Sequence, residues 1–188
     1  MSGPIRLHMS MSLDGFISGV DDRPGQGMGS NGFRLFNWLD DRDGPGINGQ
    51  VYAEVLATKA VISGRRTFEL ADGWGGDHHD GVPIHVLTHR VGQGDLPDGT
   101  TFHSDVAACA AAARATPGDE AVMMHGASAA QAFLAAGELD EMEIHLIPVL
   151  LGAGRRLFET ANDQQVELEL VRRLEGRDAT HLRYRVVH

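Results

Sequence analysis

Residues 120–159, EAVMMHGASAAQAFLAAGELDEMEIHLIPVLLGAGRRLFE, decide the fold of this chain. They begin with an apolar run of strand length, residues 121–124, which ends in the small-residue turn HGAS at 125–128. An alanine-rich stretch of good helix formers follows, Gly137 is placed to end it, and residues 142–151 form a second apolar run. This order predicts a βαβ unit. The free N–H groups at the start of its helix suit a phosphate, although the glycine could equally serve only the turn.

The composition indicates one soluble domain over residues 1–188. With 42% hydrophobic and 22% charged residues, the chain is long enough to bury a core. A net charge of −10 argues against a nucleic-acid partner, although a local basic pocket could still bind a phosphorylated small molecule. The one cysteine cannot form an internal disulfide, and no apolar stretch reaches the roughly 18 residues of a membrane helix. Since the N-terminus lacks the apolar core of a signal peptide, we expect a cytoplasmic protein.

The first third of the chain predicts a strand, a long loop and a helix. Residues 5–12 alternate apolar and polar side chains, which is the period of a strand. Asp14 follows, either as a turn former or as a carboxylate that faces a site. Residues 19–49 are rich in glycine and predict a long loop with a short helix at 33–39. The aromatic side chains of that helix could line a pocket or could only pack beneath the loop. A further helix is expected at 50–57.

A second candidate anion site follows at a strand-to-helix junction. Residues 60–64 form a short buried strand, and the helix that begins next starts with Arg65 and Arg66. Cations are disfavoured at a helix N-terminus, so either these arginines are simply solvated or their guanidinium groups bind a phosphate. Residues 71–82 form a polar loop with adjacent aspartates and histidines. Adjacent residues rarely converge on one ion, so no metal site is expected there.

The remaining segments complete an α/β fold. Strands are expected at 83–88 and 101–103, a capped helix at 106–115, and an edge hairpin from 166–174 and 180–187. Strands alternate with helices over the first 150 residues, so we expect a mostly parallel central sheet with helices on both faces and a C-terminal antiparallel hairpin. Ligands bind such sheets at the carboxyl ends of the strands, where the turns described above all fall.

Four motifs resemble those of the dihydrofolate reductase-like superfamily. They are SMSLDGFI at residues 10–17, GRRTFE at 64–69, GAS at 126–128 and PVLLGAG at 148–154. The closer resemblance is to the reductase (C-terminal) domain of the riboflavin-biosynthesis deaminase-reductase proteins and their stand-alone relatives, and it covers nearly the whole chain. It implies a dihydrofolate reductase-like fold, NADPH as the cofactor, hydride transfer to a small-molecule substrate, and a homodimer.

The resemblance also implies which residues hold the cofactor. Those that would bind its 2′-phosphate and pyrophosphate lie at two strand-to-helix turns: Gly64, Arg65, Arg66, Thr67, Gly126, Ala127, Ser128 and Ala129. Those beside the adenosine end follow the next strand: Thr88, His89 and Arg90. Ser10 and Ile17 would line the nicotinamide. Asp14 is the first candidate to bind the substrate or relay a proton, with His125 and Asp40 as alternatives.

Two departures from the family pattern bear on the substrate. The turn that typically reads Glu-Gly-Gly is HGA at residues 125–127, and Asp40 and Asp41 are out of register with the acidic residue that holds the pterin in dihydrofolate reductases. The first hypothesis is therefore an NADPH-dependent reductase of a small heterocyclic or carbonyl substrate. The second is the 5-amino-6-(5-phosphoribosylamino)uracil reductase of riboflavin biosynthesis, which needs another anion site, at residues 155–156 or in the long loop. The third is an NADPH-binding module without turnover.

Overall fold

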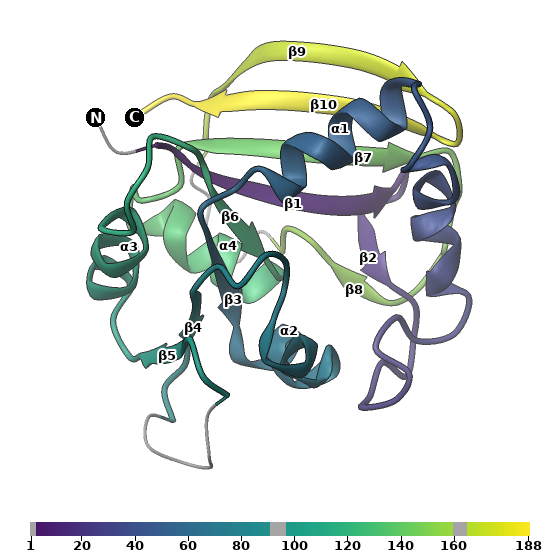
Figure 1. Cartoon of the computed structure of the whole chain (residues 1–188). Helices are drawn as coiled ribbons and strands as arrows, with labels where there is room; N and C mark the ends of the chain where they lie inside the picture. Colours follow the sequence, from purple (N-terminus) through teal and green to yellow (C-terminus); the bar gives the residue numbers. More distant parts are fainter. Residues whose placement is uncertain (1–2, 91–96, 160–164) are drawn as a thin grey trace.

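The computed structural model describes residues 3–90, 97–159 and 165–188, and an eight-stranded sheet runs through its centre (Figure 1). The strands are β1 (Ile5–Ser12), β3 (Ala60–Gly64), β4 (Ile84–Leu87), β5 (Thr100–His103), β6 (Val122–His125), β7 (Glu141–Ile147), β9 (Leu168–Gly176) and β10 (Ala179–Val186). They lie in the order β5-β4-β3-β6-β1-β7-β10-β9. The pairs from β5 to β7 are parallel, and β10 and β9 add an antiparallel hairpin. The predicted mostly parallel sheet and C-terminal hairpin are confirmed.

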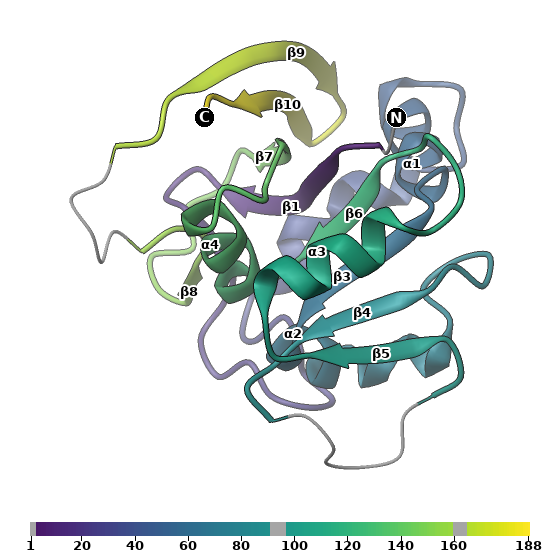
Figure 2. The same ribbon diagram turned by 90° about the vertical axis from the view of Figure 1, so that its left-hand side faces the viewer.

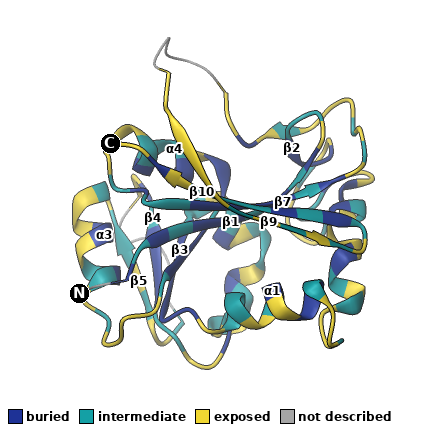
Figure 3. Ribbon diagram, turned by 90° about the horizontal axis from the view of Figure 1, so that it is seen from above, coloured by how far each residue is buried: buried dark blue, intermediate teal, exposed yellow. Residues whose placement is uncertain are grey.

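Helices cover both faces of the sheet, as predicted. They are α1 (Ile47–Leu56), α2 (Arg65–Leu70), α3 (Val106–Arg114) and α4 (Ala127–Ala135), with the 3-10 helices η1 (Gly32–Asp41) and η2 (Asp72–Gly76). Figure 2 shows α3 and α4 in front of the sheet and α1 and α2 behind it. Figure 3, seen from above, places α4 and α1 on opposite sides of the strands. No helix within the described ranges is long and apolar enough to cross a bilayer.

The side chains of β1 alternate between the two faces of the sheet, which carry different parts of the molecule. Ile5 and Leu7 are fully buried in a core with α3 and α4. Because successive side chains of a strand point to opposite faces, Ser10 points the other way, where it lies opposite His145 of β7. Trp38 of η1 reaches this face and donates from its indole Nε1 to Ser10 Oγ at 2.9 Å. The polar side of β1 therefore lies beneath η1.

Four charged side chains fasten α1 to the antiparallel part of the sheet. Glu143 of β7 is fully buried and accepts from Arg172 of β9 at 3.1 Å and from Arg183 of β10. Both arginines also donate to Glu54 of α1 at 2.7 Å. The two carboxylates and two guanidinium groups neutralise one another, which is what allows charges to remain in so enclosed a place.

The predicted elements are present, and the main errors concern their ends. The strand predicted over 142–151 is too long at its C-terminal end, because Pro148 has no N–H to continue the ladder and β7 ends at Ile147. The helix predicted over 50–57 begins earlier, at Ile47, and the short helix predicted over 33–39 is η1. A small second sheet, formed by β2 (Phe16–Ser18) and β8 (Arg155–Arg156), was not predicted.

Candidate active site

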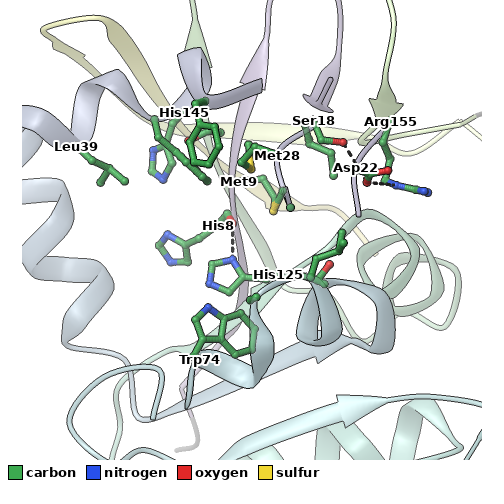
Figure 4. A pocket seen from close by; sticks show the side chains of 18 of the residues that line it. His8, Met9, Ser18, Asp22, Met28, Leu39, Trp74, His125, His145 and Arg155 are labelled. Atoms are coloured by element: carbon green, nitrogen blue, oxygen red, sulfur yellow. Dashed lines mark hydrogen bonds and ion pairs between the residues drawn. The ribbon is translucent and has the colours of Figure 1, made fainter. Parts of the chain in front are cut away.

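A cavity of about 510 Å³ lies on the polar face of the sheet (Figure 4). Side chains of β1, β6 and β7 form its floor, and side chains of η1, α1, α2 and η2 form its walls. Phe33, Phe36 and Trp38 all line it, which confirms that the aromatic residues of the long loop can wall a pocket. Trp38 also packs in a core cluster with Leu35, so the alternative reading of core packing holds for it as well.

Four imidazoles are among the polar groups of this largely apolar cavity. His8, His125 and His145 belong to the floor and His78 to the wall. Burial lowers the pKa of His125 to about 4 and that of His78 to about 3, and it holds the pKa values of His8 and His145 well below the ordinary value. All four rings are therefore neutral near pH 7. Both ring nitrogens of His8 are buried and have no partner among the described residues.

A chain of hydrogen bonds occupies both nitrogens of His125. Its Nδ1 lies 3.0 Å from the carbonyl oxygen of His8, so Nδ1 must carry the proton and donate. Its Nε2, 3.0 Å from Nε2 of His78, is then the acceptor. His78 in turn contacts His79 through the Nδ1 atoms at 2.8 Å, and His79 Nε2 ends the chain at Thr58. While these hydrogen bonds are intact, His125 is a structural part of the cavity floor rather than a free acid or base.

The charged residues of the cavity form one ion-paired group. Asp22 accepts from Arg66 at 2.7 Å and from Arg155 at 3.4 Å, as Figure 4 shows for Arg155. Burial would raise the pKa of Asp22, but the hydrogen bonds and charges of the two arginines outweigh it and lower the pKa. The pair of positive charges is thus partly neutralised at the mouth between β8 and α2.

The two predicted phosphate-binding turns lie against each other. Gly126 has φ +95° and no side chain, and a Cβ atom there would lie 2.5 Å from Thr67 Oγ1 and 3.7 Å from the nitrogen of Gly64. A Cβ on Gly64 would touch Ala129. The first turns of α2 and α4 therefore meet with almost no space between them. Their N–H groups, which no helical carbonyl accepts, converge on the same edge, together with Ala127 and Ser128 in the first turn of α4.

The predicted adenosine end gathers around Arg65. Its Nη1 donates to the carbonyl oxygen of Arg90 at 3.2 Å, and its Nε donates to Glu69 at 2.6 Å. Thr88 Oγ1 accepts from the N–H of Arg90 at 3.0 Å, and His89 between them is exposed. The structure thus brings the eleven residues predicted to hold the phosphates and the adenosine end to one edge of the sheet. Of these, only Arg66 and Thr67 line the cavity, and the predicted nicotinamide pair of Ser10 and Ile17 lines it as well.

Asp14 lies outside the cavity lining, at the end of β1. Its carboxylate accepts from Ser12 Oγ at 2.6 Å and from the backbone N–H groups of Leu151 and Gly152 at 3.1 and 2.8 Å. These hydrogen bonds, that of Ser12 first, lower its pKa to about 2. The contacts favour a role in holding the 148–152 loop, and the catalytic role stays a prediction. The alternative, Asp40, is exposed and does not line the cavity either.

Sequence reasoning missed several residues of the cavity. Among them are His8, Asp22, Tyr52, Trp74, His78 and His145. A signal existed for two of these residues. His8 shares the polar side of an alternating strand with Ser10, and His145 is, with Glu143, one of two polar residues in a largely apolar run. The other four lie in loops or on helices whose position over the sheet is not encoded locally.

The chain was compared with family models, with proteins of curated function and with solved structures. The family model of the RibD C-terminal domain matches residues 4–182. Comparison with proteins of curated function gives no match. A solved structure of a protein assigned to riboflavin biosynthesis, from Shewanella sp. PV-4, is 20% identical, with a TM-score of 0.72 over 98% of this chain and 99% of that one.

Two further solved structures share the fold at lower identity. The diaminohydroxyphosphoribosylaminopyrimidine deaminase/5-amino-6-(5-phosphoribosylamino)uracil reductase of Thermotoga maritima is 13% identical, with a TM-score of 0.67. That alignment covers 99% of this chain but 57% of the Thermotoga protein. Dihydrofolate reductase from Enterococcus faecalis, solved with NADP(H), is 14% identical, with a TM-score of 0.65 over 100% of this chain and 99% of that one. At these identities the likeness establishes the dihydrofolate reductase-like fold.

Proposed function

The chain belongs to the RibD C-terminal domain family, and from this premise we propose that it is an NADPH-dependent reductase of a small heterocyclic or carbonyl substrate. The cofactor would supply the hydride, and the protein would supply orientation, a dry site and a source of protons. The observation that carries the proposal is the close meeting of the α2 and α4 N-termini beside the cavity. The first N–H groups of two helices, which have no helical carbonyl to accept them, would then serve one anion.

The residues at this edge fit a dinucleotide phosphate. Gly126 lies tightly against Thr67, and a Cβ at Gly126 would clash with the Thr67 hydroxyl, so a residue without a side chain lets the two turns meet. Gly126, Ala127, Ser128 and Ala129 would hold the pyrophosphate. Arg65 supports a preference for the 2′-phosphate because it lies beside Thr88, His89 and Arg90, away from the cavity. Its partner Glu69 is exposed and can be displaced by a phosphate.

The cavity residues support a reaction on an uncharged ring. Apolar side chains and neutral imidazoles line most of the cavity, and its charged residues Asp22, Arg66 and Arg155 are ion-paired with one another. Ser10 and Ile17 would fix the nicotinamide against the substrate. The indole of Trp38 holds the Ser10 hydroxyl in place at 2.9 Å. Asp14 stays the first candidate for proton relay, acting through the loop that it holds.

A second candidate function is the 5-amino-6-(5-phosphoribosylamino)uracil reductase activity named for the Thermotoga protein. One observation favours it: Arg155, predicted as a substrate-phosphate site, lines the cavity. Asp22 opposes it, because this carboxylate already binds Arg155 and Arg66 and would repel a phosphate. The first candidate is therefore preferred.

Titration of the purified protein with NADPH and NADH tests the proposal. Trp38 and Trp74 line the cavity, so their fluorescence should report binding. We expect clear preference for NADPH, and replacing Arg65 by alanine should weaken NADPH about ten- to a hundredfold, the effect of losing a charged hydrogen bond, with little change for NADH. The control is Arg173→Ala, an exposed arginine on β9. Equal losses for both cofactors would refute the Arg65 assignment, and binding of neither would refute the function.

A substrate panel then separates turnover from binding. Oxidation of NADPH, followed by its absorbance, with a carbonyl or an unphosphorylated heterocycle supports the first candidate. Oxidation only with the phosphoribosylaminouracil supports the second. Tight binding without oxidation of the cofactor by any compound supports a non-catalytic module. The expected homodimer and cytoplasmic location stay predictions, and light scattering of the purified protein checks the first of them.

A further inference from the structure

His145 occupies a distinctive place in the cavity floor. It lies in the middle of β7, is 3% exposed and lines the cavity (Figure 4). Its ring centroid is 4.5 Å from that of Trp38. On the side away from the cavity, His181 of β10 lies directly opposite in the strand register, and Asn48 of α1 stands behind His181. Asn48, His181 and His145 thus form a hydrogen-bonded chain from α1 to the cavity.

Asn48 fixes the direction of the hydrogen bonds along this chain of three side chains. Asn48 is 1% exposed, and its amide nitrogen donates to the carbonyl oxygens of Trp38 and Arg177, both at 2.9 Å. Its amide oxygen must therefore face His181, whose Nε2 lies 3.1 Å away. An amide oxygen only accepts hydrogen bonds, so Nε2 of His181 carries the proton.

The protonation of His181 fixes that of His145 in the cavity floor. Burial lowers the pKa of His181 to about 4, so its ring is neutral at pH 7 and its Nδ1 is bare. Nδ1 of His145 lies 2.8 Å from this bare nitrogen and must donate to it. Burial is the main cause that holds the pKa of His145 well below its ordinary value, and the electrostatic effect of His181 is the second. The ring of His145 therefore carries a single proton. That proton is on Nδ1, and Nε2 of His145 is left as an acceptor.

Nothing in the described part of the chain uses this acceptor. The indole Nε1–H of Trp38, whose ring packs against His145, already donates its hydrogen bond to Ser10 Oγ. The surrounding wall is mainly apolar, with Phe36 and Leu39 among its members, and Tyr52 adds a phenol ring. A ligand in this part of the cavity would therefore meet the unused acceptor of His145, and the ring of His8, whose nitrogens also have no partner among the described residues, lies 6.2 Å away between centroids.

We propose that His145 determines substrate specificity by accepting, at Nε2, a hydrogen bond from a ring N–H of a planar, uncharged, lactam-type heterocycle. The inference rests on the proposed function, since it names the substrate class of the same cavity. A ring that presents a lone pair or a methyl group at this position leaves the acceptor unsatisfied. An unmade buried hydrogen bond weakens binding about tenfold to a hundredfold.

The tautomer can be measured directly. In protein labelled with [15N]histidine, a long-range proton–nitrogen correlation spectrum distinguishes a bare ring nitrogen from a protonated one. The His145→Gln variant assigns the signals. We expect His145 to show a protonated Nδ1 and a bare Nε2 at pH 7, without any ligand. A protonated Nε2 would overturn the inference, whatever the enzyme does.

Binding of a matched pair of probes completes the test. 2-Quinolinone has one lactam N–H, and N-methyl-2-quinolinone has the same ring without it. The indole Nε1–H signal of Trp38 reports their binding. We expect the first probe to bind at least about tenfold more tightly and to shift the His145 Nε2 signal. The His145→Leu variant should lose the preference, while His145→Gln, which keeps an acceptor, should retain part of it.

The control is His103→Gln, a histidine of β5 outside the cavity, which should leave the preference unchanged. Equal binding of the two probes, including binding of neither at millimolar concentration, would overturn the inference. Titration of each variant with NADPH shows that it is folded and keeps the two proposals separate. NADPH binding without probe preference refutes only the role of His145. Probe preference without NADPH binding refutes the proposed reductase but not that role.

Discussion

The contact between Gly126 and Thr67 allows a quantitative test of the proposed phosphate-binding edge. Replacing Gly126 by alanine forces a side chain into a backbone conformation with φ +95° and ψ 137°, which costs about 1–3 kcal/mol. The new Cβ would also lie 2.5 Å from Thr67 Oγ1, and such overpacking costs about another 1–3 kcal/mol. The free energy of unfolding should fall by about 2–6 kcal/mol, as measured by urea unfolding.

Two further variants separate the two contributions. Gly81 also has a positive φ, +68°, but no atom lies within 4 Å of the position of its Cβ, so Gly81→Ala should cost only about 1–2 kcal/mol. In the Thr67→Ala background the Gly126→Ala change should lose most of its overpacking cost. NADPH binding should weaken about tenfold or more in Gly126→Ala, equivalent to about 1.4 kcal/mol, and not in Gly81→Ala. The reasoning is refuted if Gly126→Ala destabilises no more than Gly81→Ala, or if removing Thr67 Oγ1 gives no relief.

Four other predictions follow from the contacts. Replacing Glu143 by alanine should lower the free energy of unfolding by about 3–5 kcal/mol, because two largely buried arginines lose one of their two carboxylate partners and keep only Glu54; a loss under about 1 kcal/mol in urea unfolding would contradict this. Stability should fall as the pH drops from 6.5 to 4, because the unfolded chain then binds protons that His125, with a folded pKa of about 4, does not; His125→Gln should flatten this slope, which is at most about 1.4 kcal/mol per pH unit for one histidine. The thiol of Cys109 is buried with its pKa raised to about 12, so it should resist a thiol reagent at pH 8 until the protein is unfolded. Replacing Asp14 by alanine should lower the melting temperature, since two loop N–H groups lose their acceptor; a fall in kcat/KM of about a hundredfold or more with unchanged NADPH binding would instead support proton relay.

Elements with a local pattern were predictable from the sequence. β1 alternates so regularly that both of its ends were predicted, and β3 was equally clear because it is a short apolar run closed by a glycine. The turn at Gly126 was predictable because only small residues occur there. These features depend on neighbours in the sequence, which is why the strand-to-helix turns at this edge could be located without coordinates.

The chemistry of the cavity depends on contacts that no local pattern contains. Asp14 looked like a carboxylate at a strand end, but its acceptor atoms are taken by loop N–H groups more than a hundred residues away. The protonation of His145 is set by His181 and Asn48, which lie on different elements. Asp22 neutralises two arginines that the sequence suggested were free for phosphates. Each of these outcomes follows from the order in which the strands are assembled.

That strand order also has a consequence for biosynthesis. β1 leaves the ribosome long before its partner strands, since Ile5 pairs with Val122 and Arg6 with Glu141. At about 5–20 residues per second, translation needs about 6–25 seconds to supply the first of these partners. During that time one apolar face of β1 has nothing to pack against, so the nascent chain should depend on chaperones more than a protein with local contacts. Because β1, β6 and β7 together form the cavity floor, no ligand of the cavity can assist folding until Ile147, the end of β7, has been made.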